Sequence, residues 1–250
     1  LKTLYDIIEF PLEIDKGKVI LSGEKNGQSF SYESGNIQKT WWNNISYVPQ
    51  AAQSVLNPIV RLKKQFLDSI PQEDRKNETK EQTLARVAKY LEELNLSPDI
   101  LESYPFQLSG GMRQRVMIAM ALSCNPRLII ADEPTTALDV TIQAQILELL
   151  KEMRVKYNLT IILITHDLGV VAKVADYVDV MYAGKIVETG TIDEIFYDPR
   201  HPYTWGLLSA MPDLDTADER LYTIPGSPPN LLHEKAGDAF APRNPQALKI

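Results

Sequence analysis

Apolar positions at the start of the chain follow a helical spacing and then form shorter, strand-like runs. Over 1–8 they recur at the spacing of one helix face, which predicts an amphipathic helix that stops at Pro11. Short apolar runs at 18–21 and 45–48 predict two strands, with a polar stretch over 23–44 between them. The front of the chain therefore predicts one helix and two strands.

A longer helical pattern begins at Thr79. Thr79 and Gln82 have the spacing of a capping box, in which each side chain bonds the backbone N–H of the other residue. The pattern ends before Ser97 and Pro98. Its apolar residues share one helix face: Leu84, Val87, Ala88, Leu91 and Leu94. This segment predicts a helix with one buried side.

Strand-like and helical patterns alternate after Pro126. Residues 128–131 and 159–164 are short apolar runs, typical of buried parallel strands, and 141–157 between them has one apolar helix face. A helix over 167–175 follows. This order predicts an α/β fold, a mostly parallel sheet with covering helices.

The end of the chain has a different pattern. Residues 177–182 and 185–189 predict a hairpin that turns at Ala183 and Gly184. Over 199–250 prolines and glycines become dense and the periodicity fades. This part predicts a separate, loop-rich tail.

Composition narrows the class of protein. The chain has 250 residues, a net charge of −7 and 44% hydrophobic residues, the composition of an ordinary globular protein, and its length allows one large domain or a domain plus a modest appendage. A single cysteine, Cys124, excludes an internal disulfide framework and any metal site built on several thiolates. The acidic balance argues against nucleic acid as a partner.

The strongest candidate for chemistry is the pair Asp132 and Glu133, directly after the apolar run 128–131. Open α/β sheets bind ligands at the carboxyl ends of their strands, and a strand-end Asp beside bound phosphates suits Mg²⁺. The adjacent Glu can orient and deprotonate a water for attack on a phosphoryl group. The alternative is a surface acid pair that merely ends a strand, and the apolar run makes the two interpretations about equal.

A second candidate is the run Ser109, Gly110, Gly111 and Met112, ahead of another helical pattern. Such a helix start exposes backbone N–H groups, a hydroxyl and the positive end of the helix dipole, which together favour an anion. In isolation, an ordinary serine cap followed by flexible glycines is the commoner structure.

A third candidate is His166, which follows the apolar run 159–164. A single histidine at such a place is more often a structural hydrogen-bonding group than a catalyst. Its position one strand–helix–strand unit after Glu133 changes that comparison. Both side chains should reach the same crevice at the edge of the sheet.

Taken in order, the motifs resemble the ATP-binding cassette (ABC) family. They are LSGGM at 108–112, LIIADEPTTALD at 128–139 and ITHD at 164–167. The resemblance implies a P-loop NTPase-like nucleotide-binding domain in which Asp132 organises Mg²⁺, Glu133 is the general base and His166 contacts the γ-phosphate of ATP. It also implies that Asp139 belongs to a loop that communicates across a dimer, and that Gln50 meets Mg²⁺ and the attacking water.

The same resemblance implies partners and domains. In that family, the segment corresponding to 109–112 completes the ATP site of another subunit, so a second ABC ATPase subunit, identical or different, is expected. A helical subdomain over about 55–115 would dock on transmembrane permease subunits. The nucleotide-binding domain would span 1–198 and the C-terminal extension 199–250.

The tail resembles the extension of dipeptide, oligopeptide and nickel importer ATPases. Its motifs are HPYT at 201–204, IPGSPP at 224–229 and FAPR at 240–243. They imply an ATP-binding and ATP-hydrolysing subunit that energises import of peptides or related small solutes, peripheral at the cytoplasmic face of the cell membrane. An extracytoplasmic substrate-binding protein would be an indirect partner.

Two features depart from the family. The loop G-x-x-x-x-G-K-[ST] does not occur, since neither Gly-Lys pair, at 17–18 and 184–185, has a glycine five positions earlier. Because the helix over 1–8 resembles the one that follows that loop, truncation is our hypothesis, and we expect this chain to bind MgATP weakly. Relatives with an iron–sulfur cluster place cysteines where this chain has Asp238 and Asn244, so we expect no cluster.

Two other functions stay open. A degenerate, non-hydrolysing cassette acting as a structural or regulatory partner is favoured by the missing loop, while Glu133 and His166 count against it. A soluble ABC ATPase of translation or DNA repair would share the fold. The importer-type tail and the lack of a second cassette argue against that alternative.

Overall fold

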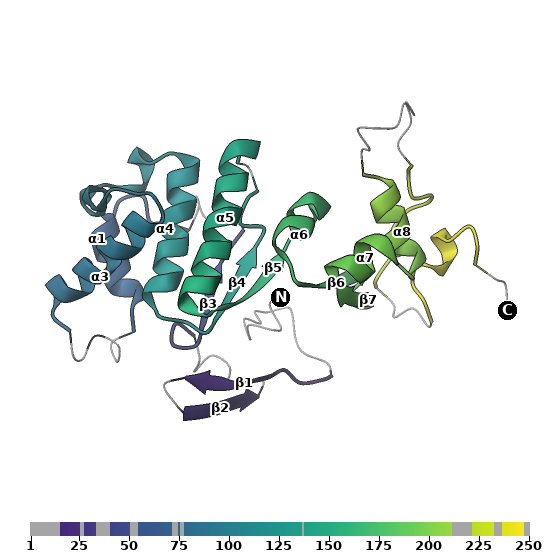
Figure 1. Ribbon diagram of the computed structural model, residues 1–250, viewed down its shortest axis with the longest axis horizontal. Helices are drawn as coiled ribbons and strands as arrows, with labels where there is room; N and C mark the ends of the chain where they lie inside the picture. The colour runs from purple at the N-terminus through teal and green to yellow at the C-terminus, as the bar shows by residue number, and fades with distance from the viewer. Residues whose placement is uncertain are drawn as a thin grey trace. The chain divides into compact units, whose positions relative to one another are not determined.

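The computed structural model contains two compact units, Leu1–His166 and Asp167–Ile250. Figure 1 labels the helices and strands and colours them in chain order. The helix predicted over 1–8 lies outside the described residues. The structure describes 16–25, 28–33, 41–50, 55–71, 75, 78–136, 138–211, 222–232 and 237–247.

A parallel sheet forms the centre of the first unit. Its strands are β3 (Ile45–Val48), β4 (Leu128–Asp132) and β5 (Thr160–Ile164), in the order β3-β4-β5. This arrangement confirms the predicted α/β class. Because the strands run in the same direction, their carboxyl ends lie at one edge, and the residues that follow each strand can meet there.

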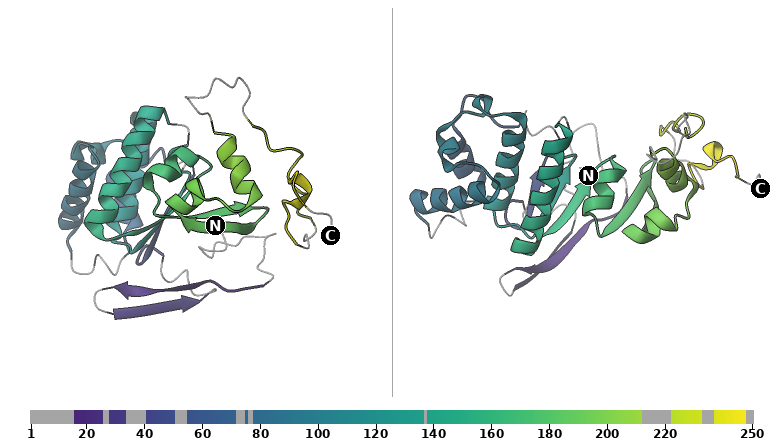
Figure 2. Two further views of the ribbon diagram at one scale, coloured as in Figure 1. Left: turned by 45° about the vertical axis from the view of Figure 1, so that its right-hand side comes forward. Right: turned by 45° about the horizontal axis from the view of Figure 1, so that its top comes forward.

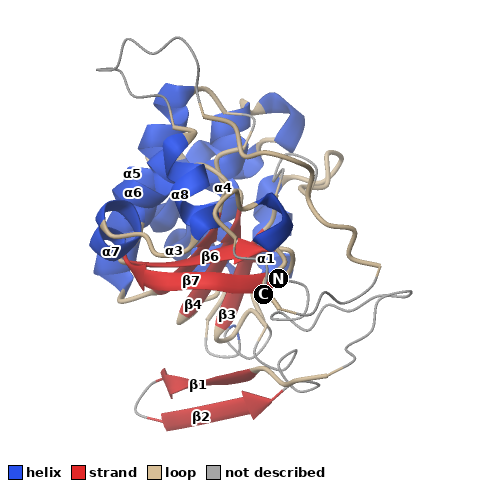
Figure 3. Cartoon of the chain, turned by 90° about the vertical axis from the view of Figure 1, so that its right-hand side faces the viewer, coloured by secondary structure: helices blue, strands red, loops and turns tan. Residues whose placement is uncertain are grey.

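Alternate residues of the strands point to opposite faces of this sheet. Ile129 and Ala131 belong to the core with α4 (Gly110–Ser123) and α5 (Val140–Tyr157), whereas Ile130 points to the other face. Figures 2 and 3 show the helices of this unit on one side of β3 and β4 and the hairpin β1–β2 on the other. The sheet is therefore apolar on both faces, as its continuous apolar strands predict.

The hairpin corrects one prediction. β1 (Ile20–Lys25) pairs with β2 (Gln28–Glu33), so the first part of the stretch expected to be a polar connection is a second strand. Its sequence, QSFSYE, has apolar residues only at alternate positions. Tyr32 packs toward the sheet, and antiparallel backbone pairing supplies the rest, so β2 needs no continuous apolar run.

The described residues between β3 and β4 include three helices and two short 3₁₀ segments. They are α1 (Leu62–Ser69), α3 (Lys80–Glu93), η3 (Pro98–Glu102), η4 (Pro105–Gln107) and α4. The capping box of α3 is confirmed, because Thr79 Oγ1 accepts from Gln82 N and Thr79 N donates to Gln82 Oε1. Leu62, Phe66 and Leu91 are fully buried in the core that these helices share with α5.

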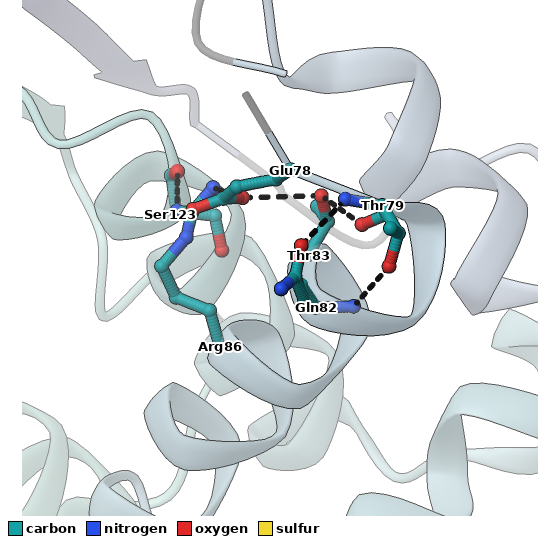
Figure 4. Close-up of polar contacts among 6 residues, drawn as sticks. All are labelled: Glu78, Thr79, Gln82, Thr83, Arg86 and Ser123. Carbon is teal, nitrogen blue, oxygen red and sulfur yellow. Dashed lines mark hydrogen bonds and ion pairs between the residues drawn. The ribbon is translucent and has the colours of Figure 1, made fainter. Parts of the chain in front are cut away.

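A charged clasp joins α3 to the end of α4 (Figure 4). Arg86 donates from Nη1 to the carbonyl of Ser123 over 2.7 Å and from Nη2 to Glu78 Oε2 over 3.0 Å. Thr83 Oγ1 donates to the same Glu78 oxygen. The bond from Arg86 lowers the pKa of Glu78 and places a cation at the negative end of α4.

Replacing Arg86 with Met should reduce the free energy of unfolding by about 1–3 kcal/mol, since Glu78 and the Ser123 carbonyl each lose the hydrogen bond from Arg86. The matched control is Lys89→Met, at an exposed position of the same helix. Urea denaturation of the two variants measures the difference. Equal midpoints would show that the clasp contributes nothing to stability.

The second unit begins with α6 (Leu168–Val174) and contains the predicted hairpin. β6 (Tyr177–Tyr182) pairs with β7 (Lys185–Thr191), and Ala183 and Gly184 both have positive φ, 51° and 80°, as a type I′ turn requires. The hairpin is followed by α7 (Ile192–Tyr197) and α8 (Pro202–Ser209). Helix α8 lies in the part expected to be rich in loops.

Arg243, in η5 (Ala241–Arg243), holds the tail of the second unit together. It donates from Nε to the carbonyl of Pro225 over 2.8 Å and from Nη1 to the Tyr182 hydroxyl over 3.1 Å. Asp238 accepts from Phe240 N over 2.8 Å.

In the described part of the chain, no helix has the length and hydrophobicity needed to cross a bilayer.

Candidate functional site

The site is built around Glu133, the first residue after β4. Its backbone is in the left-handed region, with φ of 45°, a conformation that costs a non-glycine residue energy and is enriched at functional sites. Its N–H donates to the carbonyl of Ile164 over 2.9 Å. This bond ties the ends of β4 and β5 together and brings Glu133 close to His166.

Three side chains bind the Glu133 carboxylate. His166 Nδ1 lies 3.0 Å from Oε1, while Gln50 Nε2 and Thr136 Oγ1 donate to Oε2 over 2.9 and 2.8 Å. Gln50 lies just beyond β3, so all three strands of the sheet contribute. The structure thus brings three of the predicted residues, Gln50, Glu133 and His166, into direct contact.

These bonds set the charge of the cluster. The hydrogen bond with His166 is the largest cause of a lowered pKa for Glu133, followed by the bond from Thr136. Glu133 is therefore ionised at neutral pH, and an ionised carboxylate can only accept, so His166 Nδ1 must carry the proton. The Nε2 atom of His166 is left for other partners, on a side chain that is 79% exposed.

Asp132, the last residue of β4, has a different partner. The Tyr47 hydroxyl donates to Asp132 Oδ2 over 3.0 Å. Burial and this bond raise the pKa of Tyr47 to about 12, so the hydroxyl keeps its proton at neutral pH. The described residues contain no group of three or more acidic, histidine or cysteine side chains that could hold a metal by themselves. A single strand-end carboxylate does fit Mg²⁺, which usually takes one or two carboxylates together with phosphates and water.

Ser109 is the N-cap of α4, as in the interpretation of this run as an ordinary serine cap. Its Oγ accepts from Met112 N over 3.3 Å. No hydrogen bond among the described residues joins 109–112 to the Glu133 cluster. The helix start instead meets α5, because a Cβ added to Gly111 would lie 2.8 Å from Ile142 Cγ2. Gly111 therefore has a packing role whatever else the segment does.

Substituting Gly111 with Ala should destabilise the protein by about 1–3 kcal/mol, because the added methyl group overlaps Ile142. In an open helix the same change would stabilise by roughly 0.5–1 kcal/mol, so the expected sign is informative. Combining it with Ile142→Ala should give less destabilisation than the two single changes add up to, measured as a double-mutant cycle. Strict additivity would contradict a steric cause.

Asp139, the remaining predicted residue, caps α5. Its Oδ1 accepts from Ile142 N over 2.9 Å, at the residue that Gly111 approaches. The described structure thus contains two groups of predicted residues. One is the carboxylate cluster at the sheet edge, and the other consists of 109–112 and Asp139, at the adjoining starts of α4 and α5.

Comparison with known proteins identifies the family. A family model described as ABC transporter matches 2–136, more than half of the chain. The chain belongs to the ABC transporter family. A second model, described as the C-terminal region of oligopeptide/dipeptide transporters, matches 187–250.

Curated relatives of this ABC transporter chain are named as ATP-binding proteins of oligopeptide or dipeptide transport. The oligopeptide transport ATP-binding protein OppD of Bacillus subtilis is 50% identical over 238 residues, 94% of this chain and 65% of the relative. The dipeptide transport ATP-binding protein DppD of Lactococcus lactis is 45% identical and covers 100% of this chain and 71% of its own length. For AmiE of Streptococcus pneumoniae the identity is 51%, with 82% and 58% coverage. The chain thus spans less than two thirds of the length of OppD and AmiE.

Solved structures agree on the fold. The protein cbiO1 of Clostridium perfringens, part of the ABC transporter complex cbiONQ, superposes with a TM-score of 0.58 at 26% identity and covers 69% of this chain and 66% of its own. An ATP-binding cassette dimer in a post-hydrolysis state with ADP and Pi gives 0.54 at 25% identity, covering 68% and 75%.

Two site residues of this ABC transporter chain were not predicted from the sequence. They are Tyr47, which binds Asp132, and Thr136, which binds Glu133. Thr136 lies three residues after Glu133 in the turn that follows β4, a spacing at which a short hydroxyl side chain can reach back. Tyr47 gives no comparable signal, since its contact depends on the register between β3 and β4.

Proposed function

We propose that this chain is the ATP-hydrolysing part of a subunit that energises an importer of dipeptides, oligopeptides or related small solutes. The observation that carries the proposal is Glu133, held ionised by Gln50, Thr136 and His166 at the carboxyl edge of the parallel sheet. An oriented carboxylate is the group needed to accept a proton from water attacking a phosphoryl group.

The bonding of Glu133 leaves room for that water. A carboxylate offers about four lone-pair positions, and the described residues take three: two on Oε2 by Gln50 and Thr136, and one on Oε1 by His166. The remaining position on Oε1 can accept the water proton. Because Gln50 and Thr136 both bind Oε2, the side chain stays oriented while Oε1 accepts the proton.

The exposed side chain of His166 extends the same site. With Nδ1 donating to Glu133, the ring is fixed by the carboxylate and presents Nε2 to solvent. In the doubly protonated form of the ring, both nitrogens are donors, so Nε2 can donate to a terminal phosphate oxygen, where negative charge develops during transfer. His166 thus links the position of the base to the position of the phosphate.

Asp132 and Gln50 are the residues that would hold Mg²⁺, which neutralises phosphate charge when bound with ATP. Gln50 donates from its nitrogen to Glu133, so its amide oxygen, the atom suited to a hard cation, lies outside that bond. Asp132 keeps Oδ2 on Tyr47. Both residues therefore retain an oxygen suited to this role.

Partners are the remaining part of the proposal. Because the chain belongs to the ABC transporter family, we propose that the helix start at 109–112, with Asp139 close by, contributes to the ATP site of a second ABC subunit. We place the domain boundary at 198/199, the helical subdomain at about 55–115, and the protein peripherally on the cytoplasmic face, bound to permease subunits. The tail and the names of the relatives support a peptide solute delivered by a substrate-binding protein.

Peptide uptake by cells tests this proposal. Deleting the gene should abolish uptake of labelled dipeptides or oligopeptides, the wild-type gene should restore it, and Glu133→Gln should not. An exposed acid on α5, Glu148, provides the matched control as Glu148→Gln, which should restore uptake fully. Unchanged peptide uptake in the deletion strain would contradict the proposed solute class.

A further inference from the structure

A tyrosine on a neighbouring strand holds the second acidic residue of the site. The Tyr47 hydroxyl, on β3, donates to Asp132 Oδ2, at the end of β4, over 3.0 Å. The two residues are 85 positions apart in the chain, so only the pairing of the strands brings them together. The contact therefore belongs to the fold and not to a local turn.

Strand register and packing fix the hydroxyl in place. Tyr47 lies opposite Ile130 in the parallel pair, so its side chain shares a face with Ile130 and with Asp132, two residues further on. The ring packs on the apolar cluster of Ile45 and Ile130, which are buried. A half-buried aromatic ring with few rotatable bonds carries its hydroxyl at a nearly fixed point.

A second tyrosine–carboxylate pair, Tyr157 and Glu93, differs from Tyr47 and Asp132 in how many carboxylate oxygens are bound. On α5, Tyr157 donates to Glu93 Oε2, and Lys156 is ion-paired with the other oxygen of Glu93 at 2.8 Å. Both oxygens of Glu93 are thus bound by protein groups. Among the described residues, Asp132 has a partner on Oδ2 alone, so its carboxylate is oriented but not saturated.

We propose that Tyr47 is a positioning residue that sets the Asp132 carboxylate for the divalent cation accompanying ATP, an inference that rests on the proposed function. Mg²⁺ tolerates little deviation from octahedral geometry, so a ligand fixed beforehand binds better than a freely rotating one. Hydrogen bonds to a ligating carboxylate typically change metal affinity about 10- to 100-fold when they are removed.

The test is a titration of Mn²⁺ into the full-length protein with a saturating non-hydrolysable ATP analogue, followed by electron paramagnetic resonance. Mn²⁺ accepts the same carboxylate and water ligands as Mg²⁺. Tyr47→Phe removes only the hydroxyl and should raise the Kd for Mn²⁺ about 10-fold. The affinity for the analogue without metal and the melting temperature should stay at their wild-type values. Tyr157→Phe, the matched control, should leave the Kd unchanged.

Asp132→Asn separates failure of this inference from failure of the proposed function. The Kd of this variant should rise at least as much as that of Tyr47→Phe. If Asp132→Asn weakens Mn²⁺ binding and Tyr47→Phe differs less than about twofold from wild type, the positioning role of Tyr47 is wrong. If Asp132→Asn leaves the Kd unchanged, the proposed cation site is wrong and the inference falls with it.

Discussion

Glu133→Gln should lower the rate of ATP hydrolysis by about 10²- to 10⁴-fold, the usual contribution of a general base, while ATP affinity stays unchanged. The amide can keep the geometry of the cluster. Its oxygen can accept from Gln50 and Thr136 in place of Oε2, and its NH₂ can donate to His166 Nδ1 after a change of tautomer. Only the capacity to take a proton is lost, so the change should fall on kcat and not on KM.

Steady-state hydrolysis by the full-length protein, compared with nucleotide binding measured by calorimetry, checks this result. Glu148→Gln removes one exposed acid from α5 and should leave both quantities at wild-type values. A Glu133→Gln variant that hydrolyses ATP at the wild-type rate would exclude Glu133 as the base. A parallel loss of ATP affinity would indicate a role in binding.

His166→Ala should cost about 10²- to 10³-fold in kcat, because it removes a donor from the position where phosphate charge develops. It should also change the pH profile. The bond with His166 is the largest cause of the lowered pKa of Glu133, so without it that pKa rises toward the ordinary value of a glutamate. A base must be deprotonated to act, and activity falls as the pH drops through its pKa. The acid limb of the profile should therefore move to higher pH.

Residual hydrolysis of His166→Ala measured between pH 4 and 8 tests both parts. His201→Ala in the second unit, which loses a histidine bonded to Tyr203 N, serves as the control and should keep the wild-type profile. An acid limb at the same pH as wild type would show that His166 does not set the charge of Glu133. An undiminished kcat would exclude it from the reaction.

Local signals in the sequence predicted much of this fold. The apolar runs before Glu133 and His166 predicted strands, and their shared direction predicted that the residues beyond them would meet. The capping box at Thr79 needed only neighbouring residues, and so did the turn at Ala183 and Gly184. These features depend on contacts within a few positions of the chain.

Features that depend on distant pairing could not be predicted in the same way. The strand β2 has few apolar residues and becomes recognisable only when paired with β1. The bond from Tyr47 to Asp132 requires the register of β3 against β4. The left-handed backbone of Glu133 is held by the carbonyl of Ile164, and nothing in the residue type favours it.

The fate of bound ATP in a single turnover shows whether Glu133 is the base for hydrolysis. The full-length protein is loaded with ATP labelled on the γ-phosphate, Mg²⁺ is added, and labelled phosphate is followed by rapid quench for wild type, Glu133→Gln and Glu148→Gln. We expect bound ATP to be converted in wild type and Glu148→Gln, and to remain intact in Glu133→Gln over the same period. Conversion at the wild-type rate in Glu133→Gln would contradict that role of Glu133.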